Sequence, residues 1–108
     1  MKKIPLTDTS GRWFDMDTAS AFKADSYTDA QGNVVCRATG HPEVWETLYL
    51  TLKGTFILIR DDGGDFVPGS SGAVVIEPER AAEWLIANGH QEQVKKMDME
   101  KEERRLEL

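Results

Sequence analysis

The chain has 108 residues, of which 40% are hydrophobic and 30% are charged, and its formal net charge is −6. This length allows one domain with its own core and is too short for two. The negative charge argues against direct binding of DNA or RNA, because such binding depends largely on neutralising phosphates. No apolar run approaches the ~20 residues that a membrane-spanning helix needs.

The start of the chain and its cysteine content predict a cytoplasmic location. Residues 1–5 include two lysines, but residues 7–11 are polar, and this start lacks the apolar stretch of a secretory signal peptide. A single cysteine, Cys36, cannot form an internal disulfide. It follows Val34 and Val35 in a short strand pattern, so we expect a buried cysteine with a structural role.

The N-terminal part predicts strands followed by a helix. Residues 4–14 suit one or two short strands, interrupted near Gly11. Asp15 or Asp17 then suits the N-cap of a short helix over residues 18–24, because a carboxylate accepts hydrogen bonds from the amides of a first helical turn.

The middle of the chain holds its clearest pattern, a β-hairpin over residues 46–60. A turn at residues 29–33 and a short strand at residues 34–38 precede it. The two hairpin strands are rich in β-branched and aromatic residues and meet at Lys53 and Gly54. This hairpin predicts a fold built on a sheet, with its core at mid-sequence.

Two registers of the hairpin are compatible with the sequence. A two-residue turn would place Leu50 opposite Ile57. A three-residue loop, with Gly54 in the left-handed conformation, would place Leu50 opposite Phe56 and send Ile57 to the face of Tyr49. Both registers leave few polar positions on either face, which is typical of strands that are central or covered twice.

The C-terminal half predicts a loop, a strand and a helix. Residues 61–72 form a pattern-free stretch rich in Gly, Asp and Ser, and residues 73–76 suit a strand. A helix over residues 78–88 would begin at a proline and stop at Gly89. Its expected apolar stripe consists of Ala81, Ala82, Leu85 and Ile86.

Together these patterns predict an α+β domain. It would contain an antiparallel sheet of about five strands, built on the hairpin at residues 46–60, with two short helices packed on it. We place this domain at residues 1–90. Residues 91–108 have the composition of a helix but only a weak apolar stripe, so we expect a charged tail that is helical or partly disordered.

Three blocks of the sequence resemble a family of small uncharacterised bacterial proteins. They are Leu-Thr-Asp-Thr-Ser-Gly-Arg-Trp-Phe-Asp at residues 6–15, Glu-Thr-Leu-Tyr at residues 46–49 with Gly54 downstream, and Ala-Ala-Glu-Trp-Leu-Ile-Ala-Asn-Gly-His at residues 81–90. The resemblance implies a bacterial origin and a single α+β domain. No activity is established for that family, so it supplies no functional residues.

A glycine-rich acidic stretch is the main candidate for metal binding. Asp61, Asp62 and Asp65 carry carboxylate oxygens, which suit Ca²⁺ or Mg²⁺. The stretch lacks the alternating acids and the terminal Glu of an EF-hand loop. We therefore expect a polar turn with no metal and no cofactor, and we keep a small enzyme or metal-binding protein that uses this loop as an alternative.

Three aromatic residues are candidates for an interaction surface. Trp45 and Tyr49 belong to the hairpin, and Trp84 lies beside the apolar stripe of the C-terminal helix. Partly buried aromatic residues are common at interfaces, although they also close the edges of small cores. The two expected helices cover about one face of the sheet, so we predict a homodimer held by the other face.

The functional prediction is a non-catalytic protein-interaction module from a bacterium or a mobile element. It has an unidentified protein partner and no catalytic residues. Besides the enzyme or metal-binding alternative, the acidic composition allows a nucleic-acid mimic that occupies a DNA- or RNA-binding protein.

Overall fold

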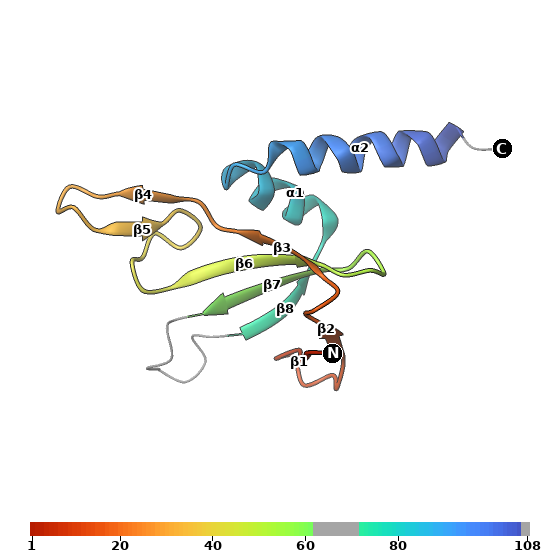
Figure 1. Cartoon of the computed structure of the whole chain (residues 1–108), viewed down its shortest axis with the longest axis horizontal. Coiled ribbons are helices and arrows are strands. Elements are labelled where there is room, and N and C mark those ends of the chain that lie inside the picture. Colours follow the sequence, from red (N-terminus) through yellow and green to blue (C-terminus); the bar gives the residue numbers. More distant parts are fainter. Residues whose placement is uncertain (62–71, 107–108) are drawn as a thin grey trace.

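The computed structural model of the chain describes residues 1–61 and 72–106, and its centre is a four-stranded antiparallel sheet (Figure 1). The strand order is β3-β6-β7-β8, while β1 pairs with β2 and β4 pairs with β5 in two separate two-stranded sheets. The predicted α+β class is confirmed. The elements are β1 (Lys3–Pro5), β2 (Trp13–Asp15), β3 (Ser20–Lys23), β4 (Ser26–Thr28), β5 (Val34–Cys36), β6 (Trp45–Leu50), β7 (Phe56–Asp61), β8 (Gly72–Ile76), α1 (Pro78–Ala87) and α2 (Gln91–Leu106).

The central hairpin of β6 and β7 adopts the register with the three-residue loop. Leu50 lies opposite Phe56, and Ile57 lies opposite Tyr49. Gly54 has a φ of 86°, in the left-handed region. This loop prevails over the two-residue turn because only the glycine has to adopt a positive φ.

One face of the four-stranded sheet, the helix face, is covered by α1 and α2 (Figure 1). Val94 and Met97 of α2 pack against the hydrophobic core between this face and the helices. The first part of the charged C-terminal segment is therefore packed on the rest of the fold. The buried residues of the helix-face core are Leu48, Phe56, Leu58, Ile76, Ala81 and Leu85.

The opposite face, the hairpin face, is partly covered by the two-stranded ribbon of β1 and β2 (Figure 1). Phe14 of β2 is buried there against Ile57 and Ala73. The amide and the hydroxyl of Thr7 both donate to the carbonyl of Ala73, at 2.9 and 3.1 Å, which fastens the ribbon to β8. This cover was not foreseen, because the sequence analysis assigned only helices to the faces of the sheet.

The helix predicted at residues 18–24 is wrong, since the chain forms strand β3 there. Phe22 pairs with Leu48 of β6 and packs against the helix-face core. The carboxylate of Asp15 accepts a hydrogen bond from the amide of Asp17 (3.0 Å) and so closes a turn instead of capping a helix. A seven-residue helix is marginal by itself, and pairing with β6 offers this segment a more stable alternative.

Helix α1 begins at its proline as predicted, but its buried stripe is shifted. Ala81 and Leu85 are buried, Ile86 is half exposed, and Trp84 faces the sheet. The residues that face inward therefore follow the i, i+3, i+4 spacing of an amphipathic helix. Gly89, with a φ of 82°, ends the helix as expected.

The hairpin of β4 and β5 extends past the end of the main sheet (Figure 1). The predicted turn at residues 29–33 joins its strands, and the carboxylate of Asp29 accepts the amide of Gln31 (2.9 Å). Strand β5 is shorter than the predicted residues 34–38. Cys36 is a free cysteine and is fully buried, as predicted for a structural residue.

Candidate interaction surface

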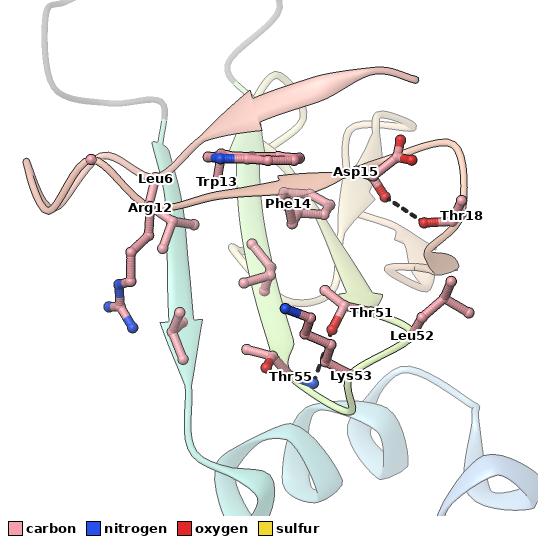
Figure 2. Close-up of a pocket in the computed structure, with 13 residues that line it drawn as sticks. Leu6, Arg12, Trp13, Phe14, Asp15, Thr18, Thr51, Leu52, Lys53 and Thr55 are labelled. Atoms are coloured by element: carbon pink, nitrogen blue, oxygen red, sulfur yellow. Dashed lines mark hydrogen bonds between the residues drawn. The ribbon is translucent and has the colours of Figure 1, made fainter.

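The β1–β2 ribbon leaves one part of the hairpin face uncovered, next to the loop that joins β6 to β7. A groove of about 630 Å³ lies there (Figure 2). In this view its upper wall is β2 with Trp13 and Phe14, and its lower wall is the loop with Leu52 and Lys53. Ile57 of β7 also lines the groove. We call this feature the hairpin groove.

The hairpin groove presents large apolar side chains to solvent. Trp13 is 46% exposed, Leu52 is 82% exposed and Val75 of β8 is 39% exposed. Ile57 is buried, so the apolar surface continues from the exposed rim into the core. Contiguous apolar surface of this kind marks sites where soluble proteins bind other molecules.

The groove also carries positive charge, in a chain whose net charge is −6. Arg12 donates from Nη2 to Asp8 (3.1 Å) and from Nε to the hydroxyl of Ser10 (3.2 Å), so its side chain is held at the rim. Lys53 forms no ion pair with any residue in the described parts of the chain. An acidic protein thus has one cation without an ion-pair partner in the described chain, Lys53, beside its exposed apolar residues.

Hydrogen bonds around Asp8 lower the pKa of its carboxyl group. The hydroxyl of Ser10, the amide of Ser10 and then the guanidinium of Arg12 lower the pKa of Asp8 from 3.8 to about 2. The carboxylate is therefore ionised throughout the neutral range and keeps its contact with Arg12.

Two contacts support the β2 wall of the groove. The ammonium of Lys3 lies 4.7 Å from the centre of the Trp13 ring, a cation–π contact. The carboxylate of Asp15 accepts the amides of Lys2 and Asp17, both at 3.0 Å. These contacts hold the exposed indole beside the groove.

The three aromatic residues predicted for an interaction surface do not share one. Tyr49 lies on the hairpin face beneath β2, with its ring centre 5.5 Å from that of Phe14. Trp45 lies on the same face, half buried, and its indole donates to the carbonyl of Pro42 (2.9 Å). Trp84 packs on the opposite face. Their role in an interface stays a prediction.

Trp84 belongs to a polar cluster that joins α1 to the sheet. Its indole donates to Oε1 of Glu46 (3.1 Å), and Arg60 donates to Oε2 of Glu46 from Nη2 (3.0 Å) and from Nε (3.3 Å). Glu46 is only 6% exposed. His90 stacks on Trp84, and its Nε2 lies 2.7 Å from the carbonyl oxygen of Lys23. Protein partners occupy both carboxylate oxygens, so the cluster ties the layers together.

The acidic loop lies mostly outside the described residues. Of its three candidate ligands, Asp61 ends β7, while Asp62 and Asp65 fall in the undescribed range. Across residues 1–61 and 72–106, no group of three or more His, Cys, Asp or Glu side chains is arranged to hold a metal ion.

The residues that form the groove were missed by the sequence analysis. Trp13 alternates with the buried Phe14 in a strand, which signals an exposed aromatic residue. Leu52 stands in a turn, where a large apolar side chain has little to pack against. Both signals were present, but only the packing of the β1–β2 ribbon across the sheet joins these residues with Val75.

Comparisons of the chain with protein-family models, with curated proteins and with solved structures found no match. The resemblance to a small bacterial family therefore stays a prediction. Neither of the two described helices is long and apolar enough to cross a membrane.

Proposed function

We propose that this chain is a non-catalytic protein-interaction module that binds a segment of another protein in the hairpin groove. The observation that supports this function is the set of exposed apolar residues around the groove, Trp13, Leu52 and Val75. Burying such side chains in a complex is favourable, and aromatic residues are enriched at interfaces.

The proposal includes a bacterial or mobile-element origin and a cytoplasmic location. The family resemblance supports the origin. The single buried thiol of Cys36 supports a reducing compartment, because the fold uses no disulfide for its stability.

Homodimerisation is a second part of the proposal, and the edge strand β8 supports it in the part beyond Ala73, whose carbonyl already accepts Thr7. Its sequence, Gly-Ala-Val-Val-Ile, has no charged residue, whereas soluble proteins usually protect an edge strand with charge, proline or a covering segment. Val74 and Val75 are both exposed on it. A second copy paired along this edge would cover Val74. This edge replaces the sheet face that we expected from the sequence, because the β1–β2 ribbon partly covers that face.

Site-specific photocrosslinking in the native host tests the interaction proposal. We would replace Leu52 with p-benzoylphenylalanine and use Met99, 72% exposed on α2, as the matched control position. We expect discrete protein adducts from position 52 and none from position 99. Equal adducts from both positions, or none from position 52, would contradict the proposal.

A further inference from the structure

Strand β2 has an outer edge that faces the hairpin groove. In the β1–β2 ladder the amide of Leu6 donates to the carbonyl of Arg12 (3.0 Å), and Phe14 lies opposite Ile4 in the same ladder. Because hydrogen bonding in an antiparallel pair alternates along the strand, the backbone groups of Trp13 and Asp15 point away from β1. Figure 2 shows that β2 lies between β1 and the groove.

Part of this edge has no partner in the described chain. The carbonyl of Asp15 accepts the hydroxyl of Thr18 (3.3 Å), but no described group bonds the amide of Trp13, the carbonyl of Trp13 or the amide of Asp15. Two donors and one acceptor are therefore available along the groove. An extended segment pairs with such groups by adding a strand.

The groove beside this edge suits the alternating side chains of an extended segment. A third strand next to β2 would lie over the uncovered part of the sheet, where Ile57 and Val75 line the groove. Every second side chain of the segment would face these apolar residues, and the others would lie on the side of Trp13. Apolar residues at alternate positions are therefore expected in the segment.

The charged side chains of the groove indicate which residues the segment would carry between its apolar residues. Lys53 reaches from the loop toward β2, and Arg12 stands at the rim (Figure 2). Asp15 is the only carboxylate among the described lining residues; it forms no ion pair with Lys53 and accepts the amides of Lys2 and Asp17. Lys53 has no ion-pair partner in the described chain, so an acidic side chain of the segment next to it would be favoured.

A second copy of this chain does not suit the same edge through antiparallel pairing of its own β2. If the two β2 strands paired antiparallel about a twofold axis, the two ribbons would join into one sheet. The face of each ribbon that packs on its own four-stranded sheet would then lie on the same side. Each ribbon lies over its own four-stranded sheet, so the two sheets would compete for the space beneath the paired ribbons. The edge is therefore open to a single extended segment and closed to a second ribbon with its sheet attached.

We propose that the hairpin groove binds an extended segment with alternating apolar and acidic residues, which adds as a third strand to the outer edge of β2. This inference rests on the proposed interaction function and specifies the partner by its chemistry. Its experiment uses synthetic peptides and not the cellular partner, so either proposal can fail alone.

Amide hydrogen exchange of the full chain, followed by NMR, tests strand addition. The probe is the peptide acetyl-Val-Glu-Val-Glu-Val-amide, and its control has lysine at both glutamate positions. With the glutamate peptide bound, exchange at the amides of Trp13 and Asp15 should slow by about tenfold, because both gain an acceptor. The amide of Phe14 is the internal reference, since it already pairs with Ile4.

A charge reversal completes the test. Lys53→Glu should weaken binding of the glutamate peptide by about fivefold, whereas Lys96→Glu, the same change on exposed α2, should leave it unaltered. The lysine peptide should bind about tenfold more weakly than the glutamate peptide. Unchanged exchange at Trp13 and Asp15, equal binding of the two peptides, or no binding of the glutamate peptide would overturn the inference. Adducts from position 52 would still support the interaction function in each of these cases.

Discussion

Asp8, Ser10 and Arg12 form a small hydrogen-bonded turn at the rim of the hairpin groove. The carboxylate of Asp8 accepts the amide of Ser10 (3.0 Å) and the guanidinium of Arg12 (3.1 Å). The three residues are close in sequence, so the turn organises itself locally. It determines where one cationic side chain of the groove lies.

The pKa of Asp8 is a direct readout of this turn. We expect a value of about 2, below the ordinary 3.8, when the carboxyl resonance is titrated by NMR. The pKa of Asp8 is lower in the folded chain than in the unfolded chain, so the ionised carboxylate stabilises the fold. This contribution to stability is fully present above pH 3.8 and is lost as the pH falls through about 2. Ser10→Ala should raise the pKa toward its ordinary value, while Ser20→Ala, an exposed serine of β3, should not change it. A pKa near 3.8 in the unmodified chain would show that the turn is absent.

The buried carboxylate of Glu46 matters for stability because it bonds two different elements. In Glu46→Ala the indole of Trp84 loses its acceptor and Arg60 loses its ion pair, so we expect a loss of about 1–3 kcal/mol in the free energy of unfolding. Glu46→Gln keeps an oxygen for Trp84 and should cost less. Urea unfolding measures both changes. Equal losses in the two variants would mean that the bond to Trp84 contributes nothing.

At the level of single elements, the sequence predicted those whose signals are local. The β6–β7 hairpin has two apolar strands around Gly54, and α1 lies between a proline and Gly89. The segment that forms β3 was predicted as a helix because its stabilisation comes from pairing with β6, far along the chain. In α2 the charged residues hid the contribution of Val94 and Met97 to the core.

The loop of the central hairpin depends on the left-handed conformation of Gly54. A Cβ added there meets no atom within 4 Å, so any cost of Gly54→Ala comes from the backbone alone. We expect a loss of about 1 kcal/mol for Gly54→Ala and a smaller loss for Gly54→Asn, because asparagine tolerates this conformation better. Denaturant unfolding of the two variants measures both losses in the free energy of unfolding. A neutral Gly54→Ala would argue for a different loop and hence a different register.

At the scale of the whole molecule, the groove arises from incomplete cover of one sheet face. The sequence correctly indicated strands that are apolar on both faces. It did not show that β1 and β2 pair and lie across one face, because that packing joins residues such as Thr7 and Ala73 from opposite parts of the chain. The candidate site therefore became visible only with the tertiary structure.

The oligomeric state tests the proposed use of the β8 edge. We expect a homodimer at micromolar concentration that is lost in Val74→Lys and kept in Val74→Thr, measured by sedimentation. Deleting residues 99–108 should leave the dimer intact, because this deletion spares Val94 and Met97, which pack on the core. A monomer at all concentrations would contradict dimerisation, and a dimer lost only on truncation would place the interface on α2.

Amide exchange of the full chain with the partner captured from position 52 tests the central claim, that the hairpin groove is the protein-binding surface. We predict slower exchange in β2, in the loop from Thr51 to Thr55 and at Val75, with no change along α1. Slower exchange confined to α1 and α2, with the groove unaffected, would contradict the account and place binding on the helix side of the molecule.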